Sequence, residues 1–275
     1  MQEYGQGANE GGVFHRGGHI VLTGLGTIMK RHPAIVLLSK WLRLYSNFIA
    51  MGKFVSVDIK YKSVVLQIIC AHMPSQHSCA EYTRALLLLE HIMTLPSKDV
   101  GFANKPVHCI LGVDANEGLT PMFEFPTNPI TELVGEFTTG RRGPCSVLFN
   151  EFVHANGLVA INTWAHHSQH VDRDAIYTWE RGGAKNQKDF ILVQADFLQG
   201  KDLLAQVMHD VKLPIVSDHR MLRVDIQVSP SWIKAKSTSS FGWQVRPAPH
   251  GEDFKDFVAR RLSEPYEAST LPPFD

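Results

Sequence analysis

The sequence predicts an α+β protein, a layered sandwich in which short strands outnumber helices. Apolar segments of strand length recur between residues 17 and 228, and Gly, Pro and polar residues separate them. Three segments of the chain instead carry apolar residues at helical spacing. The chain has 275 residues, of which 44% are hydrophobic, and this is enough for one large core or two small ones. Strands that do not alternate regularly with helices favour the α+β class.

The first expected strand is "GGHIVLTG", which is bounded by glycines. "KFVSVDIKY" alternates apolar and polar residues, and "KSVVLQIICAHMP" is almost continuously apolar after a short turn. Because a strand buried on both faces has a continuous apolar sequence, these two segments predict an antiparallel hairpin whose second strand is central. The other expected strands are "KPVHCILGVDAN", "LVAINTW", "IYTW", "KDFILVQA" and the last one within "IVSDHRMLRVDIQV".

Two helices are expected inside this region. Ser78 and Glu81 form an S-x-x-E capping box, which predicts a helix that must end by Pro96. The apolar face of this helix consists of Tyr82, Leu86, Leu89 and Met93. The segment "CSVLFNEFVHANG" predicts a second helix, which Gly157 closes.

The two ends of the chain differ from the region between them. Residues 1–16 are polar and Gly-rich, so we expect a frayed N-terminus without regular structure, followed by one domain over 17–228. Residues 229–250 are rich in Ser, Pro and Lys, which is typical of a linker. Residues 251–275 are expected to form a C-terminal amphipathic helix and a tail, with Phe254, Phe257, Val258 and Leu262 at helical spacing.

The composition indicates the cellular environment of the protein more clearly than it indicates a binding partner. Lys plus Arg equals Asp plus Glu at 27 each, so net charge does not indicate nucleic acid, although a local basic groove would suffice. Lys40 and Arg43 interrupt the apolar region 33–52, which argues against a membrane span. The four cysteines form no CxxC pair and are expected to be buried thiols of a reducing compartment. We therefore expect an intracellular protein without a membrane partner, and its oligomeric state stays open.

Polar side chains are concentrated where expected strands end. In chain order, His72 follows one strand, Asp114 and Asn116 follow another, and Asp189 and the pair Asp218-His219 adjoin two more. Taken singly, a histidine after a strand is commonly structural, and an Asp-x-Asn loop is commonly a turn or a helix cap. Because strands hold the residues at their ends rigidly, the four clusters together favour one functional site.

The order of these clusters resembles the endonuclease/exonuclease/phosphatase superfamily. The resemblance extends over roughly residues 17–228 and rests on short motifs whose order is specific. These motifs are His72-x-Pro74, Gly112-x-Asp114-x-Asn116, Asn162-Thr163, Tyr177-Thr178-Trp179, Lys188-Asp189-Phe190 and Ser217-Asp218-His219. Within the superfamily, the segment "TTGRRGPCSVLFNEFVHANGLVAINTW" is most similar to retrotransposon-type endonucleases.

The resemblance implies two β-sheet layers flanked by helices, the four-layer deoxyribonuclease-like sandwich. It also implies hydrolysis of phosphate esters with a divalent metal, usually Mg²⁺ and alternatively Mn²⁺. A phosphodiester already carries negative charge, so its hydrolysis needs a deprotonated water and positive charge near the phosphoryl oxygens. His219 suits the general base, because an imidazole titrates near neutral pH. The resemblance implies that Asp189 orients this imidazole.

The role of Asp218 follows from chain geometry, and the roles of Asp114, Asn116 and His72 follow from the resemblance. Asp218 is expected to point away from His219 along an extended chain and to bind the metal. Asp114 would orient or activate the attacking water or the leaving group, and Asn116 would donate its amide to the phosphoryl oxygens. His72 occupies the position at which the deoxyribonuclease branch has a histidine, and it would stabilise the phosphate or assist the leaving oxygen.

One part of the family pattern is missing. The family begins with two strands, and the second ends in Gln-Glu, whose Glu binds the metal. Here only Gln2-Glu3 matches, without a preceding strand, so Glu3 is a weak candidate and an N-terminally truncated copy is expected. Glu117 is expected to cap a helix or face solvent instead of binding metal. The predicted function is a DNA endonuclease, and the alternatives are a catalytically defective remnant that binds nucleic acid or a partner, and a phosphatase of small phosphate esters.

Overall fold

A computed structural model provides the structure of the chain. The residues that it describes are 12–16, 19–23, 33–38, 44–61, 64–75, 78–95, 105–121, 133–139, 142–164, 176–198, 203–209 and 217–226. The linker expected at 229–250 and the helix and tail expected at 251–275 lie outside these residues, as does Glu3. Among the described residues, no helix is both long enough and apolar enough to cross a membrane.

Strands predominate over helices, as the sequence predicts. The N-terminal strands are β1 (Gly12–Arg16), β2 (His19–Thr23), β3 (Ala34–Leu38), β4 (Tyr45–Met51), β5 (Phe54–Tyr61), β6 (Val64–His72) and β7 (Val107–Asp114). The remaining strands are β8 (Leu158–Ala160), β9 (Trp179–Arg181), β10 (Ala184–Asn186), β11 (Asp189–Gln194), β12 (Leu203–Met208) and β13 (Met221–Ile226). The helices are α1 (Cys79–Thr94), α2 (Ser146–Ala155), α3 (Ala195–Leu198) and the 3₁₀ turn η3 (Ile161–Thr163).

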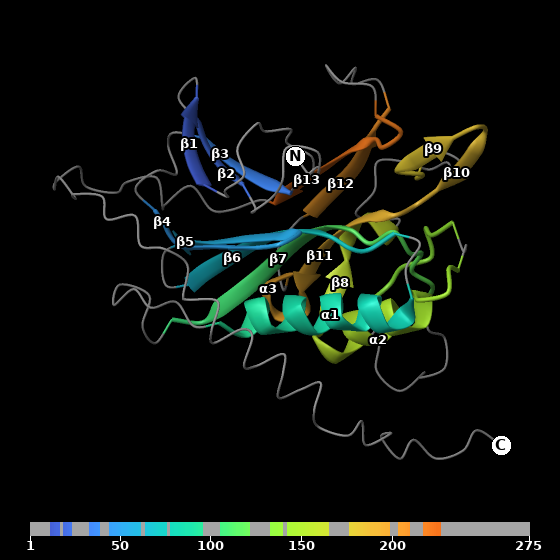
Figure 1. Ribbon diagram of the computed structural model, residues 1–275, viewed down its shortest axis with the longest axis horizontal. Helices are drawn as coiled ribbons and strands as arrows, with labels where there is room; N and C mark the ends of the chain where they lie inside the picture. Colours follow the sequence, from blue (N-terminus) through green and yellow to red (C-terminus); the bar gives the residue numbers. More distant parts are fainter. Residues whose placement is uncertain are drawn as a thin grey trace, which may run out of the picture. The chain divides into compact units, whose positions relative to one another are not determined.

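A six-stranded sheet in the order β4-β5-β6-β7-β11-β8 forms the centre of the fold. β5 and β6 are the antiparallel hairpin that the sequence predicts, and β6 pairs in parallel with β7 on its other side, so β6 is central. Helices α1 and α2 cover one face of this sheet, and both lie below it in Figure 1. The core on this side contains Tyr82 and Leu89 of α1 and Phe149 of α2.

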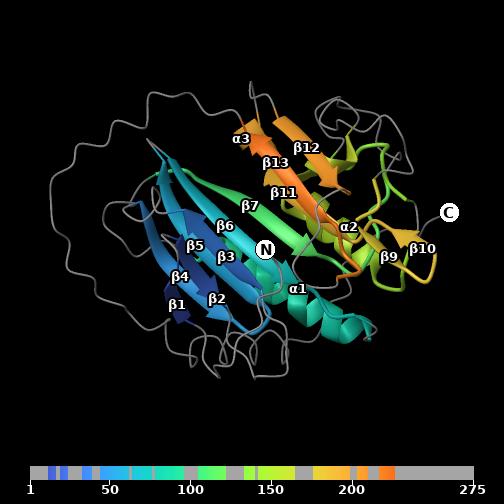
Figure 2. The ribbon, with the colours of Figure 1, turned by 90° about the horizontal axis from the view of Figure 1, so that it is seen from above.

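The opposite face of the sheet packs against a second layer of strands. Ile20 and Leu22 of β2 and Ile35 of β3 share a core with Val57 and other residues of the six-stranded sheet. Figure 2 shows β2 and β3 over β5 and β6, and β12 and β13 over the β11 side. Two sheet layers and a helical layer confirm the α+β class. The helices that a four-layer sandwich has outside its second sheet are not among the described elements.

Helix α1 begins and ends where its sequence predicts. The Ser78 side chain accepts a hydrogen bond from the backbone N–H of Glu81, which satisfies one of the donors that a helix start leaves unbonded. The helix ends at Thr94, two residues before Pro96. Its buried residues are Tyr82, Leu86, Leu89 and Ile92, and the expected Met93 is partly buried and packs against the same core. Helix α2 ends near Gly157, whose φ of +59° suits glycine.

Several strands differ from their predicted positions. β1 lies within residues 1–16, where we expected no regular structure, and it pairs with β2. In "IYTW" only Trp179 belongs to a strand, β9. The last described strand starts at Met221, so Asp218-His219 precedes it; the apolar residues 213–216, which were expected to lead into this pair, lie outside the described part. These strands form because they pair with segments that are distant in the sequence, and the local sequence does not predict this pairing.

Candidate active site

Strand register brings three of the predicted site residues into one row. β6 and β7 run in parallel and end together, with His72 paired to Asp114. β11 runs antiparallel to β7 and starts at the same edge, with Asp189 paired to Asp114. Paired residues on neighbouring strands point to the same face of a sheet, so the three side chains lie side by side. Strand ends that lie far apart in the sequence therefore meet at one edge of the sheet.

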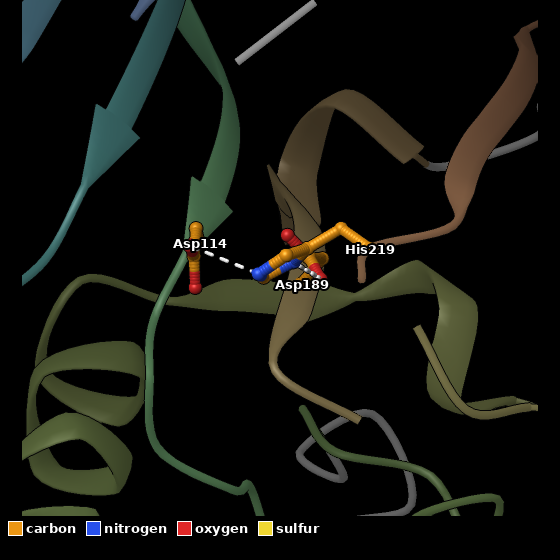
Figure 3. Close-up of side chains that lie close together, drawn as sticks. All are labelled: Asp114, Asp189 and His219. Carbon is orange, nitrogen blue, oxygen red and sulfur yellow. Dashed lines mark hydrogen bonds and ion pairs between the residues drawn. The ribbon is translucent and has the colours of Figure 1, made fainter. Parts of the chain in front are cut away.

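His219 completes the cluster from the segment that precedes β13. Its Nδ1 lies 2.9 Å from Asp189 Oδ2, and its Nε2 lies 3.9 Å from Asp114 Oδ2. Figure 3 shows the imidazole between the two carboxylates. The Ser217 hydroxyl accepts a hydrogen bond from the His219 backbone N–H at 3.1 Å, and residue 219 forms an isolated bridge with Trp179. Both the backbone and the imidazole ring of His219 are therefore held in place.

Asp114 is a buried carboxylate among other titratable groups. Only 3% of the residue is exposed. Its Oδ1 accepts a hydrogen bond from the Asn116 backbone N–H, and its Oδ2 lies 3.4 Å from His72 Nε2. Burial, and then the charge of Asp189, raise the pKa of Asp114 to about 7, although His219 and Lys188 act in the opposite direction. A fixed positive charge beside Asp114 would stabilise its ionised form.

Burial dominates the pKa of Asp114, whereas neighbouring charges dominate the pKa of His219. Burial lowers the pKa of His219, but the hydrogen bond to Asp189 and the charges of Asp189, Asp114 and Asp218 outweigh burial and raise the pKa to about 9. Three carboxylates around one imidazole therefore favour the imidazolium form. A cation that shared these carboxylates would reduce this effect and favour the neutral, basic imidazole.

Two buried polar side chains hold Asp189 in place. Thr178 Oγ1 accepts hydrogen bonds from the backbone N–H groups of Lys188 and Asp189, at 3.0 and 2.9 Å, and Thr178 is fully buried. Asn162 Nδ2 donates to the Asp189 carbonyl, and Asn162 Oδ1 accepts from the Ile191 N–H. Both residues occur in the motifs of the sequence, but their positioning roles were not predicted, because they depend on strand neighbours.

Asp218 is close to the imidazole instead of pointing away from it. Its Oδ1 lies 3.9 Å from His219 Nε2, and its Oδ2 accepts a hydrogen bond from Trp179 Nε1 at 2.9 Å. The expected alternation of neighbouring side chains is wrong here, because residue 218 lies in a bend and not in a strand. Burial raises the pKa of Asp218, but the Trp179 hydrogen bond and the His219 charge outweigh it, so the pKa is lowered.

Asn116 adopts a conformation that an extended chain would not allow. Its φ is +52°, in the left-handed region that Asn tolerates. Its Nδ2 donates a hydrogen bond to the Met73 carbonyl at 2.9 Å, which ties the loop after β7 to the end of β6. The backbone at Asn116 is therefore not extended, so Asn116 does not share a face with Asp114 in the way that residues i and i+2 of a strand do. One of the two amide hydrogens of Asn116 is used in this structural bond.

Glu117 is buried and caps a helix, which confirms the first of the two expectations for it. Its Oε1 accepts from the Cys145 backbone N–H, and its Oε2 accepts from the Ser146 hydroxyl at 2.8 Å, at the start of α2. A Cβ atom at position 143 would lie 2.1 Å from Glu117 Oε2, so Gly143 permits this approach. A carboxylate at a helix N-terminus is stabilised by the helix dipole.

The cluster meets the chemical requirements of a divalent cation site. One ligand atom each from Asp114, Asp189 and His219 lie within 4.8 Å of one another. Asp189 Oδ2 is already engaged with the imidazole, whereas Asp218 adds a carboxylate oxygen on the Nε2 side. Carboxylate oxygens are the ligands that Mg²⁺ prefers, and a bound cation would oppose the burial and the Asp189 charge that raise the pKa of Asp114. The donor set therefore fits such a cation.

Neither a protein-family model nor a curated protein sequence matches this chain. Solved structures with a similar fold include the endonuclease domain of TRAS1, a telomere-specific non-LTR retrotransposon, at 16% identity. The similarity covers 77% of this chain and 81% of that domain, with a TM-score of 0.48. Humanised TDP2 of D. rerio is 13% identical over 77% of both chains, with a TM-score of 0.49. An endonuclease/exonuclease/phosphatase family protein from Bacteroides thetaiotaomicron is 13% identical over 76% of this chain and 75% of that one, with a TM-score of 0.45.

Proposed function

We propose that this protein is a metal-dependent phosphodiesterase, and specifically a DNA endonuclease of the retrotransposon type. The observation that carries the proposal is the pair formed by Asp189 and His219, with the far side of the imidazole turned toward two more carboxylates. A general base needs this arrangement, in which a carboxylate binds one ring nitrogen and the other ring nitrogen can accept a proton.

His219 is the proposed general base. Asp189 accepts the Nδ1–H, which fixes the tautomer and leaves the Nε2 lone pair to take a proton from water. Proton transfer makes the imidazole a cation, and the adjacent Asp189 stabilises that charge. Thr178 and Asn162 bind the backbone N–H and carbonyl of Asp189 and so fix its position in the sheet, which makes them positioning residues.

Asp218 and Asp114 are the proposed ligands of the cation, Mg²⁺ or alternatively Mn²⁺. When bound, the cation supplies positive charge for the phosphoryl oxygens. The Trp179 hydrogen bond at Asp218 Oδ2 fixes this carboxylate, which leaves Oδ1 turned toward the reaction side. Asp114 would in addition orient the attacking water or the leaving group.

His72 and Asn116 complete the proposed phosphate contacts. His72 Nε2 lies against Asp114 Oδ2, which favours a donor imidazole at the edge of the row. From this position, His72 would stabilise the phosphate or assist the leaving oxygen. Asn116 holds the Met73 carbonyl with one amide hydrogen, and its second amide hydrogen is proposed to donate to a phosphoryl oxygen.

The surface beside the site favours a nucleic-acid substrate over a small phosphate ester. Lys188 Nζ lies 4.0 Å from the centre of the Trp179 ring, and Lys185 Nζ lies 4.5 Å from that of Tyr177. The two lysines place positive charge beside the site, which suits an extended polyanion such as a nucleic-acid backbone. A phosphatase of small esters needs no such surface.

The test is nicking of supercoiled DNA by purified protein with Mg²⁺. Both His219→Ala and Asp189→Ala are expected to lower the rate by about 10²–10⁴, because general base catalysis contributes this much. His91→Ala is the matched control, since it removes an imidazole from α1 on the helical face of the sheet. Equal nicking by the wild-type protein and His219→Ala would refute the assignment.

The alternative function, a catalytically defective remnant, requires a separate measurement. Calorimetric titration with Mn²⁺ reports metal binding without activity, and Asp218→Ala should weaken it if Asp218 is a ligand. A remnant would bind DNA but cleave it with neither Mg²⁺ nor Mn²⁺. Turnover with either ion would exclude the remnant.

A further inference from the structure

Two cysteines from distant parts of the sequence lie in contact on the helical face of the sheet. Cys79 is the first residue of α1, and Cys145 is the N-cap residue of α2. Their Sγ atoms are 3.1 Å apart, and one thiol donates a hydrogen bond to the other. Cys79 Sγ also lies 3.5 Å from the Pro144 carbonyl. The expectation that all four cysteines are buried is wrong for Cys79, which is exposed.

The other two cysteines have a different environment. Cys70 and Cys109 are buried in strands β6 and β7. Burial raises the pKa of Cys70 to about 11 and that of Cys109 to about 12, so both stay thiols at neutral pH. Such thiols behave as small apolar side chains and react slowly with oxidants. Burial, and then the hydrogen bond with Cys79, likewise raise the pKa of Cys145 to about 12, so the pKa does not separate it from the two strand cysteines. What distinguishes the pair at the two helix starts is the exposure of Cys79 and the contact between the two thiols.

We propose that Cys79 and Cys145 are a peroxide-sensitive modification site that forms a reversible intramolecular disulfide. In the first step, the Cys79 sulfur attacks one oxygen of hydrogen peroxide, the O–O bond breaks, and Cys79 sulfenic acid and water are produced. In the second step, the Cys145 sulfur attacks the Cys79 sulfur, the S–OH bond breaks, and the Cys145 proton leaves with the hydroxyl group as water. Two thiols are oxidised, and one peroxide is reduced to two waters.

The geometry assigns different roles to the two thiols. Cys79 is exposed and meets the oxidant first, whereas only 2% of Cys145 is exposed, so it acts as the second, resolving thiol. A disulfide requires an S–S separation of about 2 Å, so the sulfurs must approach each other by about 1 Å. The first turn of α1 is exposed at Cys79 and Ala80, so this end of the helix can make the adjustment.

The bond would join segments that support the row of strand ends. α1 follows the end of β6, and Tyr82 of α1 donates a hydrogen bond to the Ala115 carbonyl, directly after Asp114. The start of α2 binds Glu117, in the same loop. The two cysteines are 66 positions apart, so the bond closes a long loop and restricts the unfolded chain. The oxidised form is therefore expected to be the more stable one.

The proposal is tested by treating the full-length protein with hydrogen peroxide, followed by alkylation, proteolysis and mass spectrometry. A Cys79–Cys145 cross-linked peptide should form and should disappear after reduction with dithiothreitol. The thermal midpoint of the oxidised form should exceed that of the reduced form by roughly 5 °C or more. In Cys145→Ser, Cys79 should instead accumulate as a sulfenic acid that dimedone captures, and the midpoint should not rise after peroxide.

The double variant Cys70→Ala/Cys109→Ala is the matched control, because it removes the two buried thiols and keeps the pair. It should form the cross-link at the wild-type rate. The cross-linked peptide is identified in the wild-type protein, so the test remains valid even if a variant fails to fold. The proposal is overturned if Cys145 remains open to alkylation after unfolding of the peroxide-treated protein, or if Cys79 links only to a second molecule.

Discussion

Asp114, at the end of β7, and Glu117, three positions later in the following loop, are both buried carboxylates, but their surroundings differ. Glu117 receives hydrogen bonds from the Cys145 backbone N–H and the Ser146 hydroxyl at the start of α2. Asp114 receives one backbone hydrogen bond and otherwise faces two imidazoles and a second carboxylate. Neutral donors around a carboxylate indicate a structural role, whereas neighbouring titratable groups indicate a site that exchanges protons or binds a cation.

The contrast also shows why burial alone does not identify a functional carboxylate. Glu117 is 8% exposed and Asp114 is 3% exposed, so exposure does not separate them. The pKa of Asp114 is raised, which means that the folded protein destabilises its charge at neutral pH. Residues that lower stability in this way persist when function requires them.

Asp114→Asn should have the largest effect. The amide removes a buried charge but keeps an acceptor for the Asn116 N–H. We expect DNA nicking to fall by about 10³, because electrostatic and proton-transfer roles are lost together. The free energy of unfolding at pH 7 should rise by ~1–3 kcal/mol. Urea denaturation and the nicking assay measure the two effects. If Asp114→Asn were less stable and fully active, Asp114 would have the structural role that we assign to Glu117.

The pH dependence of stability should show the charge network of the site. The pKa of His219 is raised from the ordinary 6.5 to about 9, so the stabilisation is complete below pH 6.5 and is lost as the pH rises through 9. The loss should be on the order of 2–3 kcal/mol in metal-free buffer. Urea denaturation between pH 6 and pH 10, compared with His219→Gln, measures it. Parallel curves for the two proteins would contradict the assignment.

Glu117→Gln should give the reverse of the Asp114 result, with a smaller change. Loss of the carboxylate weakens the hydrogen bonds and the charge interaction at the start of α2. We expect the free energy of unfolding to fall by ~1–2 kcal/mol and nicking to stay within a few-fold of wild type. Denaturant midpoints and initial rates measure this. Loss of activity without loss of stability would assign Glu117 to the site.

Trp179→Phe should give the smallest effect. Phenylalanine keeps an aromatic ring for Lys188 but removes the Nε1–H that binds Asp218 Oδ2. Nicking and Mn²⁺ affinity should each fall by roughly 3- to 10-fold, with little change in the free energy of unfolding. Unchanged Mn²⁺ affinity would show that the Trp179 hydrogen bond does not position a metal ligand.

Much of the central sheet follows from local sequence. The continuous apolar run of β6 and the alternation in β5 predict their pairing, and the capping box at Ser78 predicts the start of α1. β12 was not predicted because "LLAQVM" consists largely of residues that also favour helices, and only its pairing with β13 makes it a strand. β3 was missed because "AIVLL" has no periodicity that distinguishes a strand from other buried segments.

The convergence of the candidate residues was predictable from the sequence, but their fine geometry was not. His72, Asp114, Asp189 and His219 were selected because polar residues at strand ends converge, and the structure brings them together. The direction of the Asp218 side chain and the φ of Asn116 depend on a bend and a turn that follow from tertiary contacts. The supporting roles of Thr178 and Asn162 likewise depend on which strands lie adjacent.

The alignment of His72, Asp114 and Asp189 across three strands has a consequence for how the sequence can vary in length. Side chains alternate between the two faces of a sheet, so one residue inserted within β7 would turn Asp114 toward the helices or move it out of line with Asp189. Length changes in the connections between strands would leave the alignment intact. Relatives that share this chemistry should therefore vary freely in their loops while keeping the lengths of β6, β7 and β11 constant.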